Sequence, residues 1–387
     1  MEARPHNEET AMKAPTALKK QNKTAHKAPS HSAPKQNIDG TKQPVLPKHG
    51  AVKNVNLALQ GGGAHGAFAW GVLDYLLEDG RLGFEGISAT SAGAMNAAVC
   101  AHGMLENGRD GAREALHAFW KSVSDAGKHS PIKPGFLNAI RGSYSLDDSP
   151  GYFFSDMLSR IFSPYQLNPF NFNPLKDLLE AHVDFERLRT ARNSIQLHIC
   201  ATNVETGKVR IFNNRELTAD SVLASACLPF LFQAVEIGGE FFWDGGYIGN
   251  PAIYPLIYKS DSRDVVIVHI NPVVRKGCPK TAAEIMNRLN EISFNSSLMR
   301  EMRAICFVSK LVERGKVAEG DMKQMLIHSI RADDFMSELG VSSKLNSDWK
   351  FLTFLRDAGR KAVAEWLESS FQKIGSESTV DIEKEFL

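Results

Sequence analysis

The chain has 387 residues and a formal net charge of +1, with 43% hydrophobic and 23% charged residues. This length can bury a sizeable core, in one large α/β domain or two ordinary ones, and the composition is that of a folded globular protein. The near-neutral charge argues against a chain tuned as a whole for nucleic acid, so we expect no nucleic-acid partner. Five scattered cysteines without a C-x-x-C pair favour free thiols in a reducing compartment over a disulfide framework or a zinc site.

Residues 1–50 differ from the rest of the chain. They carry nine Lys or Arg against four Asp or Glu, and almost no large apolar residue before Val45, which is typical of a disordered basic tail. Its lysines could touch anionic lipid headgroups, but a solvated extension without a function is the more common case. We find no Sec-type signal peptide and no run near the roughly 20 apolar residues of a transmembrane helix. We therefore expect a cytoplasmic protein, with peripheral membrane contact and export by another route left open.

Two turns of small residues occur early in the chain, each after a strand and before a helix. Residues 52–59 alternate in polarity like a strand, and the turn Gly-Gly-Gly-Ala-His-Gly at 61–66 opens a helix. Residues 84–90 form a second, shorter strand, which leads into Ala-Thr-Ser-Ala-Gly at 89–93 and a helix of small residues. This βαβ progression predicts a parallel sheet with both turns at the carboxyl ends of its strands, where such sheets bind ligands.

The later elements follow from periodicity and turn residues. In chain order we predict a helix at 112–124, a Pro- and aromatic-rich stretch at 131–174 with a short helix at 158–162, a strand at 194–202 with a hairpin to 209–211, a helix at 221–227, a strand at 240–243, a helix after Pro251, a central strand at 264–270, a long helical region from 281 interrupted at 295–297, a strand at 325–330 and a helix at 347–371. The aromatic stretch suits an apolar flap, although ordinary core residues under a long loop explain most of its aromatics equally well.

The predicted architecture is a three-layer α/β/α fold with a mainly parallel central sheet and a helical C-terminal extension. We divide the chain into the tail at 1–50, a main domain at 51–280, the extension at 281–375 packed on that domain, and a frayed end at 376–387.

Ser91 has the setting of a catalytic nucleophile. Small neighbours allow the sharp strand-to-helix turn that lifts a serine hydroxyl out of the backbone, and a nearby glycine loop can donate N–H groups to an oxyanion. A serine also needs a base, and Asp244 in Asp-Gly-Gly at 244–246 is the candidate.

The glycine loop has a competing interpretation. Gly61, Gly63 and Gly66 satisfy G-x-G-x-x-G, and Glu85 follows about 20 residues later, as in dinucleotide-binding folds. However, Glu85 lies at the start of the second strand, whereas a ribose-binding acid belongs at its carboxyl end. A nucleotide-binding oxidoreductase is therefore the weaker hypothesis.

Three motifs in order make the chain resemble the patatin-like phospholipases. Some bacterial members of that family also have a C-terminal helical extension, which the chain resembles as well. The three motifs are G-G-G-x-[KR]-G at 61–66, G-x-S-x-G at 89–93 and D-G-[GA] at 244–246, and the resemblance covers roughly residues 52–275. The chain departs from the family pattern in two places: His65 replaces the usual Lys or Arg, and Ala89 replaces the first glycine of the serine motif.

The resemblance implies a lipid acyl hydrolase of the phospholipase A type with a Ser91–Asp244 dyad, acting without a metal or organic cofactor. Backbone amides of Gly62, Gly63 and Ala92 would bind the oxyanion. The substrate would be a lipid or phospholipid acyl ester, while any protein partner is unknown.

Two alternatives remain open. His269 could act as the base of a Ser-Asp-His triad if its strand ends beside Ser91. A catalytically weakened lipid-binding or scaffolding protein of the same fold would explain the replacements at His65 and Ala89.

Overall fold

One mixed sheet organises the part of the chain that the computed structural model describes, which is residues 52–128, 144–146, 149–192, 194–317 and 322–387. Its eight strands are β1 (Lys53–Leu59), β2 (Leu82–Ala89), β3 (Gln196–Asn203), β4 (Val209–Asn213), β5 (Val235–Ile237), β6 (Glu240–Asp244), β7 (Asp264–Val268) and β8 (Leu326–Ile330). The order is β5-β6-β3-β2-β1-β7-β8, with β4 also on β3. The run from β8 to β3 is parallel, while β4, β5 and β6 pair antiparallel. The predicted mainly parallel sheet is confirmed.

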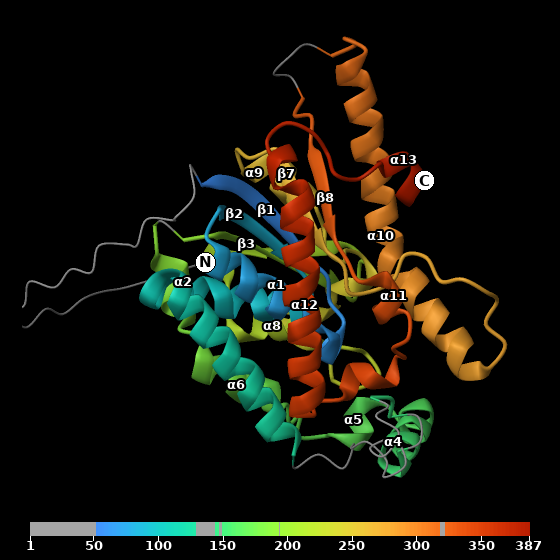
Figure 1. Ribbon diagram of the computed structural model, residues 1–387. Coiled ribbons are helices and arrows are strands. Elements are labelled where there is room, and N and C mark those ends of the chain that lie inside the picture. Colours follow the sequence, from blue (N-terminus) through green and yellow to red (C-terminus); the bar gives the residue numbers. More distant parts are fainter. Residues whose placement is uncertain (1–51, 129–143, 147–148, 193, 318–321) are drawn as a thin grey trace, which may run out of the picture. The chain divides into compact units, whose positions relative to one another are not determined.

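Helices connect and cover these strands (Figure 1). They are α1 (Gly66–Asp79), α2 (Ala92–Gly127), α4 (Pro150–Ile161), α5 (Pro164–Leu167), α6 (Pro174–His182), α7 (Phe185–Thr190), α8 (Ala219–Ser225), α9 (Tyr254–Lys259), α10 (Ala282–Glu313), α11 (Asp333–Met336), α12 (Trp349–Ser370) and α13 (Ile382–Phe386). Short 3-10 turns are η1 (Gly63–His65), η2 (Asn214–Glu216), η3 (Gly245–Tyr247), η4 (Ser342–Leu345) and η5 (Phe371–Lys373). Among the described residues, no helix is both long and apolar enough to cross a bilayer.

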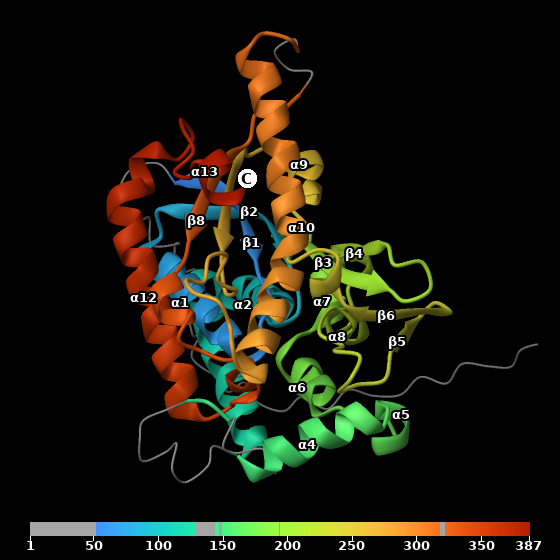
Figure 2. The ribbon, with the colours of Figure 1, turned by 90° about the vertical axis from the view of Figure 1, so that its right-hand side faces the viewer.

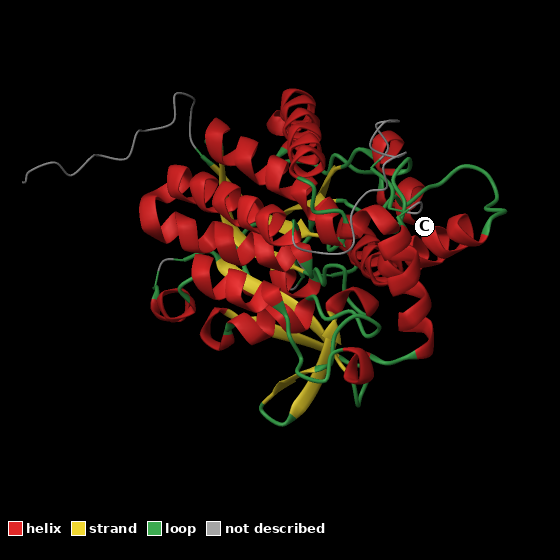
Figure 3. Ribbon diagram, turned by 90° about the horizontal axis from the view of Figure 1, so that it is seen from below, coloured by secondary structure: helices red, strands yellow, loops and turns green. Residues whose placement is uncertain are grey.

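The two faces of the sheet are packed against separate apolar cores. Val266 and Val268 of β7 point into a core shared with α1, α2 and α12, whereas Val265 and Ile267 point into a second core with α10 and α13. Alternate side chains of a strand must point to opposite faces, so the near-continuous apolar run of β7 serves both cores. Figure 2 shows α12 and α10 on opposite sides of the strands, and Figure 3 shows helices on both sides of the sheet, which is the expected three-layer arrangement.

In the C-terminal region two predictions differ from the structure, and a third, the strand at 325–330, is confirmed as part of the main sheet. Helix α10 runs unbroken through residues 295–297, where the buried Asn295 and Ser297 accept hydrogen bonds from Gln60 and Asn250, in the loops that follow β1 and η3. The strand at 325–330 is β8, and its pairing with β7 makes part of the C-terminal region an edge of the same sheet. The end expected to fray contains α13, whose Phe386 is buried.

Residues 129–143, which include the first part of the predicted flap, and the tail at 1–50 lie outside the described part of the chain. The short helix predicted at 158–162 falls within the longer α4 or just after it.

Candidate active site

The strand register brings Ser91 and Asp244 to the same level of the sheet. Ala89 of β2 pairs with Ile199 of β3, so Ser91, two residues further on, is level with Ala201. Ala201 pairs with Asp244, the last residue of β6, on the edge of β3 opposite β4, which is the edge that β2 occupies as far as Ile199. Because β6 runs antiparallel, it delivers this aspartate from some 150 residues downstream to the end of the strand that carries the serine.

Ser91 occupies a strained turn between β2 and α2. Its φ of 56° and ψ of −124° are unusual for a residue with a side chain, and such strain is typical of a nucleophile elbow. Its backbone N–H donates to Ser225 Oγ at 2.8 Å, which anchors the turn. Gly93 permits the close packing, since an added Cβ would lie 2.5 Å from the Leu59 carbonyl oxygen. Ala89 is fully buried in the β2 ladder, so its methyl is accommodated.

The Asp244 carboxyl is held in a dry position facing Ser91. Its Oδ1 accepts a hydrogen bond from Gly246 N–H at 2.7 Å. Burial raises the carboxyl pKa to about 7, against the opposing effects of the Gly246 amide, the Ser91 side chain and the charge of Lys344. Among the described residues, no group forms a well-aligned hydrogen bond with Asp244 Oδ2. The Ser91 side chain is nevertheless close enough to lower the pKa of this carboxyl. A carboxyl in this state can accept a proton near neutral pH.

The glycine loop lies against the serine turn. Gly61 N–H donates to Asn250 Oδ1 at 2.7 Å, and the Gly61 carbonyl accepts from Asn271 Nδ2 at 2.9 Å. The buried Gln60 amide ties the same loop to the backbone N–H groups that follow β7. The loop is thereby fixed from both sides, and its rigidity suits an oxyanion hole.

A cavity of about 420 Å³ opens on these residues. Ser91, Asp244 and all three amide positions named for the oxyanion, Gly62, Gly63 and Ala92, lie on its wall. Most of the remaining wall is apolar and comes from α2, the segment after α8 and α10, including Met95, Phe119, Trp120, Val123, Leu228, Phe230, Leu231, Phe232 and Phe294. The cavity can therefore hold an apolar chain with its reactive end at Ser91.

One cavity residue was missed by the sequence analysis. Lys344 of η4 lies on the same wall, beside the proposed oxyanion loop, and its side chain is charged. His65, the departure from the family's basic position, instead bonds Ser343 at 2.8 Å. Burial lowers the pKa of His65 to about 3, so the loop itself carries no charge at neutral pH. No local motif marks Lys344; only the packing of η4 on the loop reveals it.

Two of the alternatives weighed from the sequence, His269 as the base and Glu85 as a ribose-binding acid, find no support in this geometry. The ring of His269 stacks on Phe386 of α13 with centroids 6.0 Å apart, within the layer of α10 and α13. Glu85 accepts hydrogen bonds from the backbone N–H groups of Asp261 and Ser262, at the amino end of the sheet. The candidate base facing Ser91 is therefore Asp244. Glu85, the candidate ribose-binding acid, lies at the amino end of the sheet, away from the glycine loop.

A family model described as patatin-like phospholipase matches residues 57–257, slightly more than half of the chain. The chain belongs to the patatin-like phospholipase family. The patatin-like match spans the serine turn and Asp244, and ends before α10 and η4. No curated protein sequence matches the chain.

Two solved structures are similar to the chain. VipD from Legionella pneumophila is 16% identical with a TM-score of 0.33, and the match covers 79% of this chain and 67% of VipD. The type III effector ExoU is 16% identical with a TM-score of 0.30, and the match covers 83% of this chain and 64% of ExoU. The chain thus spans about two thirds of the length of each.

Proposed function

We propose that this patatin-like protein is a serine hydrolase that cleaves lipid acyl esters with Ser91 as nucleophile and Asp244 as base. The observation that carries the proposal is the pairing of a strained serine with a buried carboxyl whose pKa is about 7, on the wall of one apolar cavity. A carboxylate with raised basicity can take the place of the more usual histidine.

The reaction divides into two halves. Ser91 Oγ attacks the ester carbonyl carbon as its proton passes to Asp244, and the amides of Gly62, Gly63 and Ala92 bind the resulting oxyanion. The tetrahedral intermediate then collapses, the bond to the alcohol oxygen breaks, and Asp244 returns the proton to the leaving alcohol. A water molecule, deprotonated by Asp244, next attacks the acyl-Ser91 ester, and its proton passes from Asp244 to Ser91 Oγ as the fatty acid leaves.

Covalent labelling tests the dyad directly. A fluorophosphonate probe should label Ser91, as located by peptide mass spectrometry, and Ser91→Ala should abolish labelling and hydrolysis of a p-nitrophenyl ester. Asp244→Asn should slow both by about 100-fold or more, because the nucleophile loses its base. Ser293→Ala, which changes an exposed serine of α10, is the control and should label normally.

The opposite result would decide against the proposal. If Asp244→Asn labels and turns over at the wild-type rate, the dyad is wrong. If the wild-type protein neither labels nor hydrolyses esters but binds lipid, the binding or scaffolding alternative replaces it.

We also propose that the segment of α4, α5 and the loop to α6 contacts the membrane surface. It presents exposed apolar side chains that a water-facing loop does not need: Phe154, Ile161, Phe162, Tyr165, Leu167, Phe170 and Phe172. Tyr152 and Ser159 of α4 lie on the cavity wall, so this surface adjoins the cavity. A lipid at this surface would have a short path to Ser91.

A further inference from the structure

The cavity contains one cationic side chain whose charge is not matched by an ion pair. The Lys344 ammonium donates to Asn271 Oδ1 at 2.9 Å and to Asn290 Oδ1 at 2.7 Å, both neutral acceptors. It also lies 5.5 Å from the ring centroid of Phe294. Within the described ranges no carboxylate comes within ion-pair distance of it. An ammonium has three N–H donors, so one remains for a ligand.

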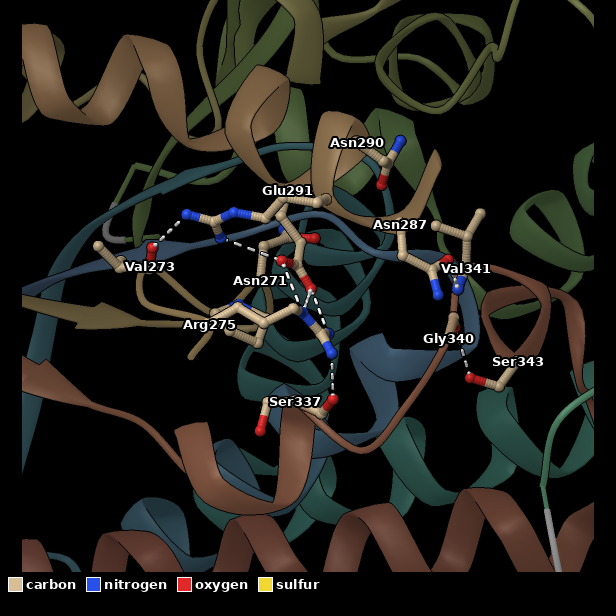
Figure 4. A network of polar contacts seen from close by, with 12 residues as sticks. Asn271, Val273, Arg275, Asn287, Asn290, Glu291, Ser337, Gly340, Val341 and Ser343 are labelled. Carbon is tan, nitrogen blue, oxygen red and sulfur yellow. Dashed lines mark hydrogen bonds and ion pairs between the residues drawn. The ribbon is translucent and has the colours of Figure 1, made fainter. Parts of the chain in front are cut away.

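Contacts with α10 and with the loop after β7 hold the segment that carries Lys344. Figure 4 shows the supporting contacts: Asn287 of α10 accepts from Val341 N–H at 2.7 Å, and Arg275 reaches the Ser337 carbonyl. Arg275 in turn pairs with the buried Glu291. These bonds fix the segment that precedes η4.

The backbone of Lys344 is fixed as well. Gly63 adopts a φ of +58°, and a Cβ there would overlap the Lys344 carbonyl oxygen. The η4 backbone therefore packs directly against the glycine loop.

The charges around Lys344 leave this end of the cavity with an excess of positive charge. Glu291 is already engaged by both Arg275 and Arg288. Asp244 and Glu291 act on Lys344 only from a longer range, and burial lowers its pKa to about 8, so the ammonium is mostly protonated at pH 7. Leaving a buried charge without a partner costs free energy, which an anion in the cavity would recover.

We propose that Lys344, together with Asn290, forms a subsite for an anionic group of the substrate next to the scissile ester. This inference rests on the proposed function and adds the substrate class: acyl esters that carry a phosphodiester or a free carboxylate. The acyl chain lies along the apolar wall from α2 and residues 228–232, and the anion lies at the part of the wall that Asn290 of α10 and Lys344 of η4 provide. Lys344 is outside the residues matched by the family model, so the subsite is a feature of the C-terminal region.

Matched pairs of substrates test the subsite. The phosphodiester pair is dihexanoyl phosphatidylglycerol and dihexanoylglycerol, and the carboxylate pair is O-hexanoyl lactate and its methyl ester. For each pair the readout is the ratio of kcat/KM for the anionic ester to that for the neutral ester. A ratio cancels any general loss of folding or catalysis. The pair with the higher wild-type ratio identifies which anion the subsite accepts.

Lys344→Met should lower this ratio about tenfold, the effect of losing one charge-assisted hydrogen bond. Lys344→Arg should retain most of the ratio, because it keeps the charge. Lys350→Met, which changes an exposed lysine at the start of α12, is the control and should leave the ratio unchanged.

Inhibition supplies a second measurement that does not require turnover of an anionic ester. Hexyl phosphate should inhibit hydrolysis of the neutral ester, and Lys344→Met should raise its inhibition constant about tenfold. An unchanged ratio for both pairs together with an unchanged inhibition constant would overturn the subsite. Failure of the proposed function is a separate result, seen as wild-type protein that does not hydrolyse the neutral esters and is not labelled at Ser91.

Discussion

Asp244 illustrates a residue that favours chemistry at the expense of stability. Its pKa is raised from 3.8 to about 7 by burial, so the folded state binds this proton more tightly than the unfolded state. The carboxyl therefore supports folding fully below about pH 4, and this contribution is lost as the pH rises through about 7. A neutral side chain of similar shape at position 244 would not lose this contribution to stability as the pH rises.

We accordingly expect Asp244→Asn to be more stable than the wild-type protein at pH 8, and the gain to be smaller at pH 5. The upper bound of the gain is about 4 kcal/mol, from about three pKa units. Urea unfolding at the two pH values measures it. Asp110→Asn, at an exposed site, should show no such pH dependence. A gain for Asp244→Asn that is equal at both pH values would show that the raised pKa is wrong.

The same pKa sets the pH dependence of catalysis. Because the base must be deprotonated, kcat/KM for an uncharged ester should rise with pH and level off above about pH 7. Because an uncharged ester has no ionisable group, the pH profile of kcat/KM then reports only on groups of the enzyme. A profile that is flat from about pH 5.5 to 8.5 would exclude Asp244 as the base.

Short motifs pointed to two residues of the candidate site. Ser91 and Asp244 stand in short motifs with small neighbours, because a sharp turn and a close approach restrict the local sequence. Lys344 has no such signature: it is a lysine in a polar segment, and its importance depends on Gly63, Asn271 and Asn290, which are distant in sequence. Non-local contacts of this kind cannot be read from periodicity.

At the scale of elements, the strands and the helices with clear periodicity could be predicted, while polar residues inside a helix were misinterpreted. Asn295 and Ser297 suggested a break in α10, but the Asn295 amide oxygen accepts from Gln60 and Ser297 accepts from Asn250 N–H. These contacts tie α10 to the two loops that form the site. A polar gap on an apolar helix face can therefore mark a hydrogen-bonded contact as well as a terminus.

The exposed segment from α4 to α6 gives a prediction at this scale. Phe170 and Phe172 are 94% and 69% exposed, so replacing both by Asp should cost little stability but oppose insertion into a lipid surface. The ratio of activity on phospholipid vesicles to activity on a monomeric ester should fall about tenfold or more. Phe307→Asp, at an exposed position of α10, serves as the control. An unchanged ratio in the double variant would remove this segment from the proposed membrane surface.

At the scale of the whole molecule, the region after residue 280 forms part of the main sheet and its helical layers and is not a separate extension. β8 extends the parallel sheet, and α12 packs along α1, the helix that follows the glycine loop (Figure 1). Lys53 Nζ, at the start of β1, donates to the carbonyl oxygens of Phe371 and Ile374 after α12. The proposed boundary at residue 280 therefore separates two parts that share one sheet.

The contact of α1 with α12 links this packing to the site. A Cβ on Gly359 would overlap the Phe68 carbonyl oxygen, and a Cβ on Gly71 would overlap that of Arg356, so the two helix backbones approach closely. η4 ends only a few residues before α12 begins, so a displaced α12 should also shift Lys344. We therefore expect a change in the packing of α1 against α12 to alter the proposed anion subsite as well.

Gly359→Ala should force the helices apart and lower the stability by about 1–3 kcal/mol, as expected for overpacking. The decrease should be accompanied by a lower ratio of anionic to neutral ester hydrolysis, because η4 moves with α12. Glu368→Ala, on the exposed face of the same helix, should change neither quantity. If Gly359→Ala lowers the melting temperature but leaves the substrate ratio intact, the contacts of η4 with α10 and the glycine loop are sufficient to hold it, and the position of Lys344 is independent of α12.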